Sequence, residues 1–175
     1  MKLEKIIRSI PNYPKKGILF RDITSLIENK KAFNFTIKKM KTISKKVSFS
    51  KIAAIESRGF IFASVLSFLS NKPLVLLRKK GKLPGKTYSK KFKLEYGFDV
   101  LEIHKSSLNK NDKVLIIDDL IATGGTALAS AKLVEKAKAK VSGFIFLINL
   151  FDLHGDKKLK SKGYKTFSLI KFPGH

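Results

Sequence analysis

Residues 114–126 read Val-Leu-Ile-Ile-Asp-Asp-Leu-Ile-Ala-Thr-Gly-Gly-Thr, and this stretch decides the fold. Its first four residues are apolar and mostly β-branched, a pattern typical of a strand that is buried on both faces. Two acids and a Gly-Gly turn follow. A helical pattern then begins, with Ala127, Ala131 and Val134 on one face. The stretch therefore predicts a buried strand, a polar loop and a helix in succession.

The same alternation of strand and helix extends to both sides of this stretch. Short apolar runs at 51–56, 74–77, 143–150 and 166–170 predict four further strands. A helix is predicted by the spacing of Phe33, Ile37, Met40, Ile43 and Val47, and an apolar helix by residues 60–69. This order predicts an α/β fold, an open and mostly parallel twisted sheet flanked by helices. Ligands of such sheets gather at the carboxyl ends of the strands.

Two segments do not follow the alternation. Residues 79–104 carry Gly81, Pro84 and Gly85 and then two alternating stretches, which predicts a long loop with a β-hairpin, a lid. Residues 1–28 begin with a region rich in turn residues, including Pro11, Pro14 and Gly17, and look appended to the sheet.

The composition indicates a single domain without disulfides or membrane spans. The chain has 175 residues, of which 43% are hydrophobic, so we expect one domain over 1–175. It contains no cysteine, which excludes disulfides and favours a cytoplasmic location. The longest apolar runs, near 60–69 and 143–151, are too short to span a membrane.

The formal net charge of +24 would by itself suggest a nucleic-acid partner. However, the positive residues are four arginines and 33 lysines, spread over almost every segment. Nucleic-acid readers more often cluster arginine with aromatic residues. We therefore favour a coding bias toward A- and T-rich codons over a nucleic-acid partner.

The polar loop after the central strand has the chemistry of a phosphate site. Gly124 and Gly125 let backbone N–H groups point inward, the helix N-terminus adds positive charge, and Thr123 and Thr126 offer hydroxyls. Asp118 and Asp119 can accept hydrogen bonds from the vicinal hydroxyls of a ribose. The lysine of a nucleoside triphosphate P-loop is missing. Taken alone, the turn is equally well explained as an ordinary Gly-Gly turn with two exposed acids.

Stretch 114–126 as a whole resembles the phosphoribosyl pyrophosphate (PRPP) signature of type I phosphoribosyltransferases. Three more stretches resemble the adenine phosphoribosyltransferase family in particular. Residues 7–22 are similar to its base-covering N-terminal hood, and Glu-Ser-Arg-Gly-Phe at 56–60 is similar to its pyrophosphate loop. Residues 78–85 with 94–97 are similar to its mobile catalytic lid. The resemblance runs from about residue 6 to the C-terminus.

All four arginines of the chain fall in these stretches: Arg8, Arg21, Arg58 and Arg78. Lysine cannot replace arginine where a planar, bidentate donor is needed. We therefore expect the arginines to face phosphate or carboxylate groups.

The resemblance implies a purine salvage enzyme, a pentosyl transferase that converts adenine and PRPP to AMP and pyrophosphate. It implies the type I phosphoribosyltransferase fold, with a hood at 1–28 and a lid at 79–104, and a homodimer. It also implies Mg²⁺ carried by PRPP and pyrophosphate, without a permanent protein metal site.

The resemblance further assigns residues to roles. Glu95, Arg58 and Lys79 are the catalytic candidates, with Glu95 contacting the base. The PRPP and AMP site comprises Ser57, Arg58, Lys82, Tyr96, Asp118, Asp119, Ala122, Thr123, Gly124, Gly125 and Thr126. Leu19, Phe20 and Arg21 would bind adenine through a carbonyl, a stacked ring and a backbone N–H. A cis peptide is expected near Glu56–Ser57.

Two alternatives remain. The first is a phosphoribosyltransferase for another purine base, such as xanthine, which the hood disfavours. The second is a regulator that binds PRPP as an effector and nucleic acid through its lysines. This second alternative would need an added DNA-binding domain, for which the chain has no residues to spare.

Overall fold

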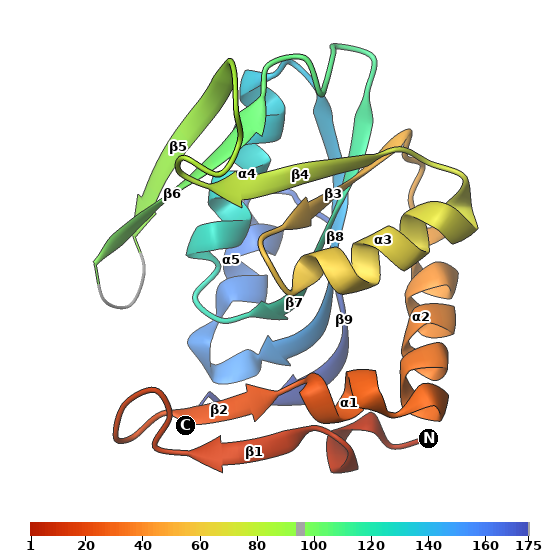
Figure 1. The fold of residues 1–175 in the computed structure, drawn as a ribbon, viewed down its shortest axis with the longest axis vertical. Coiled ribbons are helices and arrows are strands. Elements are labelled where there is room, and N and C mark those ends of the chain that lie inside the picture. Colours follow the sequence, from red (N-terminus) through yellow and green to blue (C-terminus); the bar gives the residue numbers. More distant parts are fainter. Residues whose placement is uncertain (94–96, 175) are drawn as a thin grey trace.

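The fold is built on a seven-stranded sheet, as seen in a computed structural model that describes residues 1–93 and 97–174 (Figure 1). The strand order within these residues is β5-β6-β4-β3-β7-β8-β9. The parallel strands are β3 (Lys51–Ile55), β4 (Leu74–Lys79), β7 (Lys113–Ile121), β8 (Lys140–Leu150) and β9 (Thr166–Phe172). The predicted open, mostly parallel sheet is confirmed.

Strand β7 lies in the centre of the sheet because both of its faces are apolar. Residues 114–117 are 0% exposed, and their side chains alternate between two cores. Val114 and Ile116 pack against α4 (Gly125–Lys136) and α5 (Gly155–Ser161). Leu115 and Ile117 pack on the other side, against α2 (Lys30–Ser44) and α3 (Gly59–Ser70). The polar loop that follows β7 is thus attached to the most rigid part of the molecule.

Helix α2 begins and ends close to the predicted positions. The Asn29 side chain caps its start by accepting a 3.0 Å hydrogen bond from the Ala32 N–H. The helix ends at Ser44, so Val47 lies in the following turn and not on the helix as expected. Val47 nevertheless packs against the same core as Ile37 and Met40, which explains why its spacing looked helical.

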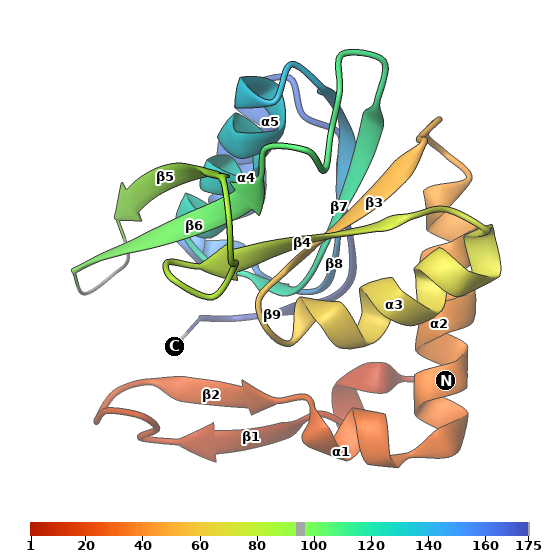
Figure 2. The same cartoon turned by 45° about the horizontal axis from the view of Figure 1, so that its top comes forward.

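The lid segment is joined to the sheet more firmly than the sequence suggested. Strands β5 (Thr87–Lys93) and β6 (Phe98–His104) form the predicted hairpin, and β6 also pairs with β4, where Lys79 lies opposite Leu101. Leu101 and Ile103 are buried in the core beside α4. Figure 2 shows the hairpin continuing the sheet beyond β4. Its base is therefore part of the domain core, and its far end projects from the sheet.

The N-terminal segment forms a separate two-stranded sheet, which the sequence did not predict. Strands β1 (Arg8–Pro11) and β2 (Leu19–Asp22) pair antiparallel with each other only. They lie between the short helix η1 (Leu3–Lys5) and α1 (Thr24–Glu28), past one end of the main sheet (Figure 2). We call residues 1–28 the hood.

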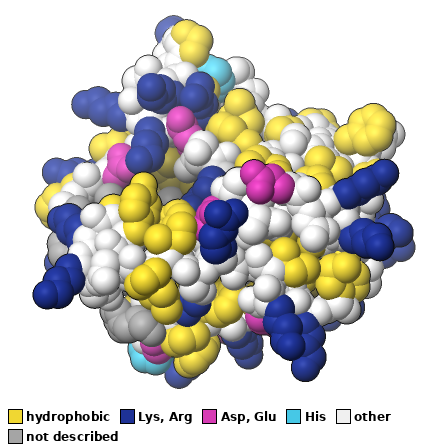
Figure 3. All heavy atoms as spheres, turned by 60° about the horizontal axis from the view of Figure 1, so that its bottom comes forward, with side chains coloured by type: hydrophobic (Ala, Val, Ile, Leu, Met, Phe, Trp, Pro, Cys, Tyr) yellow, Lys and Arg dark blue, Asp and Glu magenta, His cyan; other side chains and the backbone are white. Residues whose placement is uncertain are grey.

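The surface carries its positive charge in a dispersed form. Figure 3 shows Lys and Arg side chains over the whole visible face, with apolar side chains between them. Among the described residues, no helix combines the length and apolar character needed to span a membrane.

Candidate active site

The loop after β7 needs glycine at two positions. Gly124 has a φ of +78°, and a Cβ there would lie 3.1 Å from the backbone of Gly155. A Cβ on Gly125 would lie only 2.6 Å from the Lys93 carbonyl oxygen. Helix α4 starts at Gly125, so its free N–H groups face the space in front of the loop. The local sequence thus produces a loop whose backbone donors are open to a ligand.

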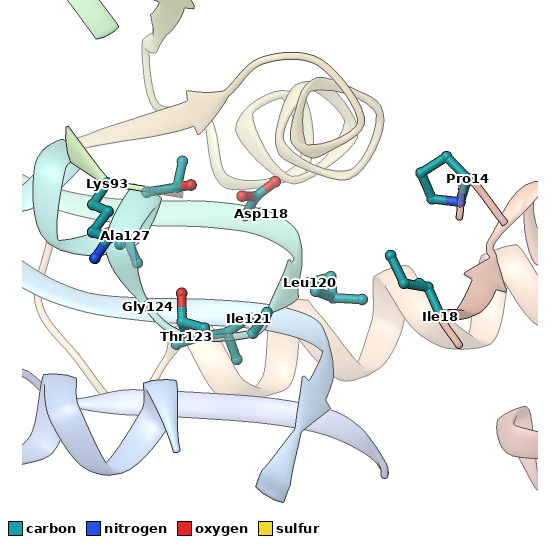
Figure 4. Close-up of a pocket in the computed structure, with 12 residues that line it drawn as sticks. Pro14, Ile18, Lys93, Asp118, Leu120, Ile121, Thr123, Gly124 and Ala127 are labelled. Atoms are coloured by element: carbon teal, nitrogen blue, oxygen red, sulfur yellow. The ribbon is translucent and has the colours of Figure 1, made fainter. Parts of the chain in front are cut away.

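A cavity of about 400 Å³, which we call the loop cavity, lies against this loop. Its walls include Asp118, Pro14, Ile18, Lys93 and residues 120–127. Figure 4 shows Pro14 and Ile18 of the hood on the side opposite Lys93 and Ala127. All five predicted loop residues line this cavity: Ala122, Thr123, Gly124, Gly125 and Thr126.

Asp118 and Asp119 lie within β7, which continues to Ile121 and does not end at the two acids as expected. Both acids are buried, so the alternative of an ordinary turn with two exposed acids is wrong. Asp118 is 9% exposed and Asp119 is 5% exposed. Burial, and then the neighbouring Asp119 carboxylate, raise the pKa of Asp118 well above its ordinary value. Burial also raises the pKa of Asp119, although the Arg58 guanidinium works against this. Both acids are held at a cost in desolvation, which is typical of functional sites.

Asp119 has an ionic partner but an incomplete set of hydrogen bonds. Arg58 Nε lies 2.8 Å from Asp119 Oδ2. The N–H direction does not make this contact a hydrogen bond, and Oδ2 has no other donor among the described residues. A buried carboxylate oxygen in this state has unused capacity to accept a hydrogen bond from a ligand.

The turn between β3 and α3 brings Ser57 and Arg58 to the same place. The Glu56–Ser57 peptide is cis, as expected. Glu56 accepts hydrogen bonds from Arg78, at 3.2 and 3.3 Å, and from the Lys79 N–H at 2.8 Å. Burial acts to raise the pKa of Glu56, but these hydrogen bonds outweigh it and lower the pKa. The ionised Glu56 therefore fixes the turn to the end of β4.

A second cavity of about 250 Å³ lies between this turn and the lid, and we call it the Arg58–Lys79 cavity. Ser57, Arg58, Lys79, Asp118, Asp119 and Thr126 all line it. Lys79 Nζ lies 3.3 Å from Asp99 of β6, which holds the ammonium at the cavity wall. These six residues were predicted from three separate stretches of sequence, and the structure brings them together around one cavity.

A third cavity of about 390 Å³, the hood cavity, is lined by the three residues predicted to bind a base, Leu19, Phe20 and Arg21. Its other walls include Arg58, Leu150, Leu153 and Gly174. The Phe20 ring lies 5.1 Å from Tyr13, edge to face, and the Arg58 guanidinium carbon lies 5.4 Å from its centre. Leu120 lines all three cavities, so they adjoin one another.

The side chain of Arg21 corrects one expectation. Arg8 faces the carboxylate of Asp22 at 3.7 Å, and Arg58 and Arg78 also face carboxylates. The Arg21 guanidinium instead donates to Ser9 Oγ and the Pro173 carbonyl, and it lies 4.3 Å from the Phe172 ring centre. The expectation that the arginines face anionic groups is therefore wrong for Arg21, because its side chain is buried among neutral acceptors.

The predicted residues Glu95 and Tyr96 lie outside the described residues. The exposed Lys82 lines none of the three cavities, and its carbonyl accepts a 3.0 Å hydrogen bond from Arg78. Some residues that line the cavities were not predicted from the sequence: Phe92, Lys93, Asp99, Leu150, Leu153 and Gly174. The alternation of β5 and β6 could have indicated which of their side chains share a face, but not what they contact.

The fold and the site together define a phosphoribosyltransferase domain: a mostly parallel sheet whose central strand carries two buried acids near its carboxyl end and leads into a glycine-rich loop. Residues 24–174 match the family model described as "Phosphoribosyl transferase domain". Residues 1–23 lie outside this match, which includes the two acids and the loop after β7 but not the residues of β2.

The relatives refine this class. The chain is 59% identical to the adenine phosphoribosyltransferase of Pelagibacter ubique strain HTCC1062, over 100% of both chains. A crystal structure of the enzyme of that name from Thermoanaerobacter pseudethanolicus is 47% identical and superimposes with a TM-score of 0.93, covering 98% of each chain. One from Giardia lamblia, complexed with 9-deazaadenine, is 35% identical with a TM-score of 0.92, covering 97% of this chain and 95% of that one. The chain belongs to the adenine phosphoribosyltransferase family.

Proposed function

We propose that the protein transfers the phosphoribosyl group of PRPP to N9 of adenine, releasing pyrophosphate and forming AMP. The observation that carries this proposal is the meeting of three cavities around Leu120. One has the backbone donors for a phosphate, one has two cations for a diphosphate, and one is a largely apolar space beside Phe20. A ribose bridging the three would place its C1 where the base and pyrophosphate cavities adjoin.

The loop cavity holds the 5-phosphate in this proposal. N–H groups of residues 122–126 and the hydroxyls of Thr123 and Thr126 donate hydrogen bonds to the phosphate oxygens, assisted by the start of α4. Asp118 and Asp119 accept hydrogen bonds from the ribose hydroxyls. These contacts offset part of the desolvation that raises the pKa of both acids, since each hydroxyl replaces water that burial removed.

The Arg58–Lys79 cavity receives the pyrophosphate. Catalysis here needs charge stabilisation more than covalent chemistry, because the C1–O bond breaks as negative charge builds on the leaving group. Arg58, Lys79 and the Ser57 N–H provide that stabilisation. We assign Lys82 and Tyr96 to closing the lid over the diphosphate. We assign Glu95 to contacting the base at N7, where its carboxylate accepts the proton that the base loses as N9 bonds to C1.

The hood cavity selects the base. In this proposal the Leu19 carbonyl accepts a hydrogen bond from the 6-amino group of adenine, the Arg21 N–H donates to N1, and Phe20, which lines the same cavity, stacks on the ring. A 6-oxo purine would oppose carbonyl to carbonyl, a penalty of about 1–3 kcal/mol for each unpaired group.

The family implies Mg²⁺, and the residues present fit an ion that arrives with the substrate. Among the described residues no three His, Asp or Glu side chains lie together, whereas Asp118 and Asp119 offer hard oxygen ligands beside the proposed pyrophosphate site. When bound with PRPP, Mg²⁺ supplies positive charge that makes the diphosphate a better leaving group. Asp118 and Asp119 are the residues that would hold it.

We also propose a homodimer formed through α3 and β4. Phe68 is 85% exposed, and Ile61 and Leu69 are exposed on the same helix, with Leu76 exposed on β4. Exposed apolar groups of this size on a rigid helix are typical of a surface that pairs with another protein. Phe68→Asp should convert a dimer to a monomer, as measured by light scattering after size-exclusion chromatography. A wild-type protein that is monomeric would contradict the proposal.

The function is tested by incubating the purified protein with PRPP, Mg²⁺ and one base at a time. We expect AMP from adenine and little product from hypoxanthine or xanthine. Turnover of a 6-oxo purine but not adenine would show that the protein is a phosphoribosyltransferase for another purine base. Negligible turnover, together with salt-sensitive nucleic-acid binding that PRPP alters, would favour the regulator.

A further inference from the structure

A short segment after β9 forms one wall of the hood cavity. Gly174 lines the cavity beside Leu153, and it is buried. A Cβ on Gly174 would lie 2.8 Å from Leu153 Cγ and 2.9 Å from Asp152 Oδ1, so the backbone packs closely on that side. The position of the Pro173–Gly174 segment therefore sets how much space the cavity offers beside Leu19–Asp22.

One side chain connects this segment to the hood. Arg21 is 7% exposed and its Nη2 donates a 3.2 Å hydrogen bond to the Pro173 carbonyl. Its Nη1 donates a 2.5 Å hydrogen bond to Ser9 of β1, and its guanidinium lies 4.3 Å from the centre of the Phe172 ring. A single planar group thus contacts both strands of the hood sheet and the end of β9. A lysine ammonium on a flexible stem could not make these three contacts together.

A second side chain holds the segment from the other direction. Asp152 lies in the short helix η2 (Phe151–Leu153), which follows β8. Its Oδ1 accepts a 2.6 Å hydrogen bond from the Gly174 N–H. The Pro173–Gly174 segment is therefore fixed between the hood and the end of β8 by hydrogen bonds to two charged groups, which are stronger than those between neutral partners.

We infer that Arg21 and Asp152 are positioning residues for the base: by holding the Pro173–Gly174 segment in place they set the width of the hood cavity and hence the affinity for the base. The inference rests on the proposed function, in which this cavity takes the base. The hood needs such a tie because an isolated two-stranded sheet is at best marginally stable. Neither contact reaches the loop cavity or the Arg58–Lys79 cavity, so binding of PRPP should not depend on them.

Asp152 provides the sharper test, because its side chain is outside the proposed binding groups. Asp152→Ala removes the acceptor for the Gly174 N–H. Asp152→Asn keeps an oxygen in the same place while removing the charge. We expect Asp152→Ala to raise KM for the base by about three- to tenfold, the effect of one lost hydrogen bond, with KM for PRPP within twofold of wild type. Asp152→Asn should recover most of the base affinity.

Arg21→Lys tests the other tie and should also raise KM for the base by about tenfold or more, since two hydrogen bonds and a ring contact are lost. Arg8→Lys is its matched control, since Arg8 is on the facing strand and pairs only loosely with Asp22, at 3.7 Å. It should leave both KM values near wild type. Thermal unfolding of each variant would verify that it is folded.

The outcomes separate the inference from the function on which it rests. A wild-type protein that makes no nucleotide from any base contradicts the proposed function. A wild-type enzyme that is active, with a folded Asp152→Ala variant whose KM for the base is unchanged, overturns the inference alone. The inference is also overturned if both KM values rise in parallel, because the residue would then act on the whole fold.

Discussion

At the loop cavity, the contacts that fix the binding groups come from other backbone atoms, whereas at the hood cavity they come from side chains. The Gly155 N–H donates a 3.0 Å hydrogen bond to the Ala122 carbonyl. The Lys93 carbonyl oxygen lies so close to Gly125 that a side chain there would collide with it. At the hood cavity, Arg21 donates a 3.2 Å hydrogen bond to the Pro173 carbonyl, and the Asp152 carboxylate accepts a 2.6 Å hydrogen bond from the Gly174 N–H.

This difference has a consequence for tolerance to change. Backbone atoms inside a packed core have almost no freedom to move, so a substitution that collides with them displaces the loop itself. Contacts made by side chains can be removed one hydrogen bond at a time, without displacing the backbone. Changes at the phosphate end should therefore abolish PRPP use, while changes at the base end should lower affinity for the base by graded amounts.

The largest effect is expected where the substrate meets the buried acids. Asp118→Asn combined with Asp119→Asn should reduce kcat/KM for PRPP by about 100- to 1000-fold, because two charge-assisted hydrogen bonds to the ribose are weakened. Steady-state kinetics with PRPP varied at saturating adenine would measure it. Near-normal kinetics in the double variant would refute the assignment of Asp118 and Asp119 to the ribose hydroxyls.

A change outside the PRPP motif should come next. In Gly155→Ala the new Cβ would lie 2.2 Å from the Ala122 carbonyl oxygen and 2.7 Å from the Gly124 nitrogen. The loop must shift, and a displacement of about 1 Å at a binding group can cost about 100-fold in rate. We expect kcat/KM for PRPP to fall by about that factor.

Gly143→Ala is the matched control for this glycine. Its Cβ would lie 3.0 Å from the Lys165 carbonyl oxygen, between β8 and the residues that precede β9, away from the three cavities. Both variants should unfold at lower temperature, but only Gly155→Ala should change the kinetics with PRPP. Equal kinetic losses in the two would mean that general destabilisation, and not the loop position, is being measured.

The base end should respond less strongly. Phe20→Leu keeps an apolar side chain in the hood cavity but removes the ring that we assign to stacking on adenine. Base–aromatic stacking is worth about 1–3 kcal/mol, so KM for adenine should rise by about tenfold while KM for PRPP stays within twofold. If KM for adenine does not change, Phe20 serves only to pack against Tyr13.

The same difference explains what the sequence could predict. The residues of the phosphate end could be named from one contiguous stretch, an apolar strand, two acids and a Gly-Gly turn, once the family resemblance had given that stretch a role. The links at the base end could not be named in this way. Arg21 and Pro173 are 152 positions apart, and nothing in the spacing of either residue indicates that they meet. The hairpin at 79–104 was predicted from its alternation, but its pairing with β4 depends on tertiary packing.

The smallest expected effect is on stability, and it has the opposite sign to the effect on activity. Burial raises the folded-state pKa of Asp118 well above the unfolded value of about 3.9, so the native protein loses stability whenever this carboxyl must ionise. Asp118→Asn removes that cost and should stabilise the unliganded protein by about 1 kcal/mol, or about 2–4 °C in Tm, at pH 7 to 8.

The pH dependence identifies the cause of this gain. Because the folded pKa is the higher one, Asp118 costs no stability below its unfolded pKa of about 3.9, and the cost grows with rising pH until it is complete above the folded pKa. The advantage of Asp118→Asn should therefore shrink as the pH is lowered toward the unfolded pKa, in paired thermal melts of both proteins. An advantage that is constant with pH would assign the gain to packing. A variant that is less stable than wild type at pH 7 would show that the Asp119–Arg58 ion pair depends on the Asp118 carboxylate. In that case side chains, and not backbone contacts alone, would stabilise the loop cavity.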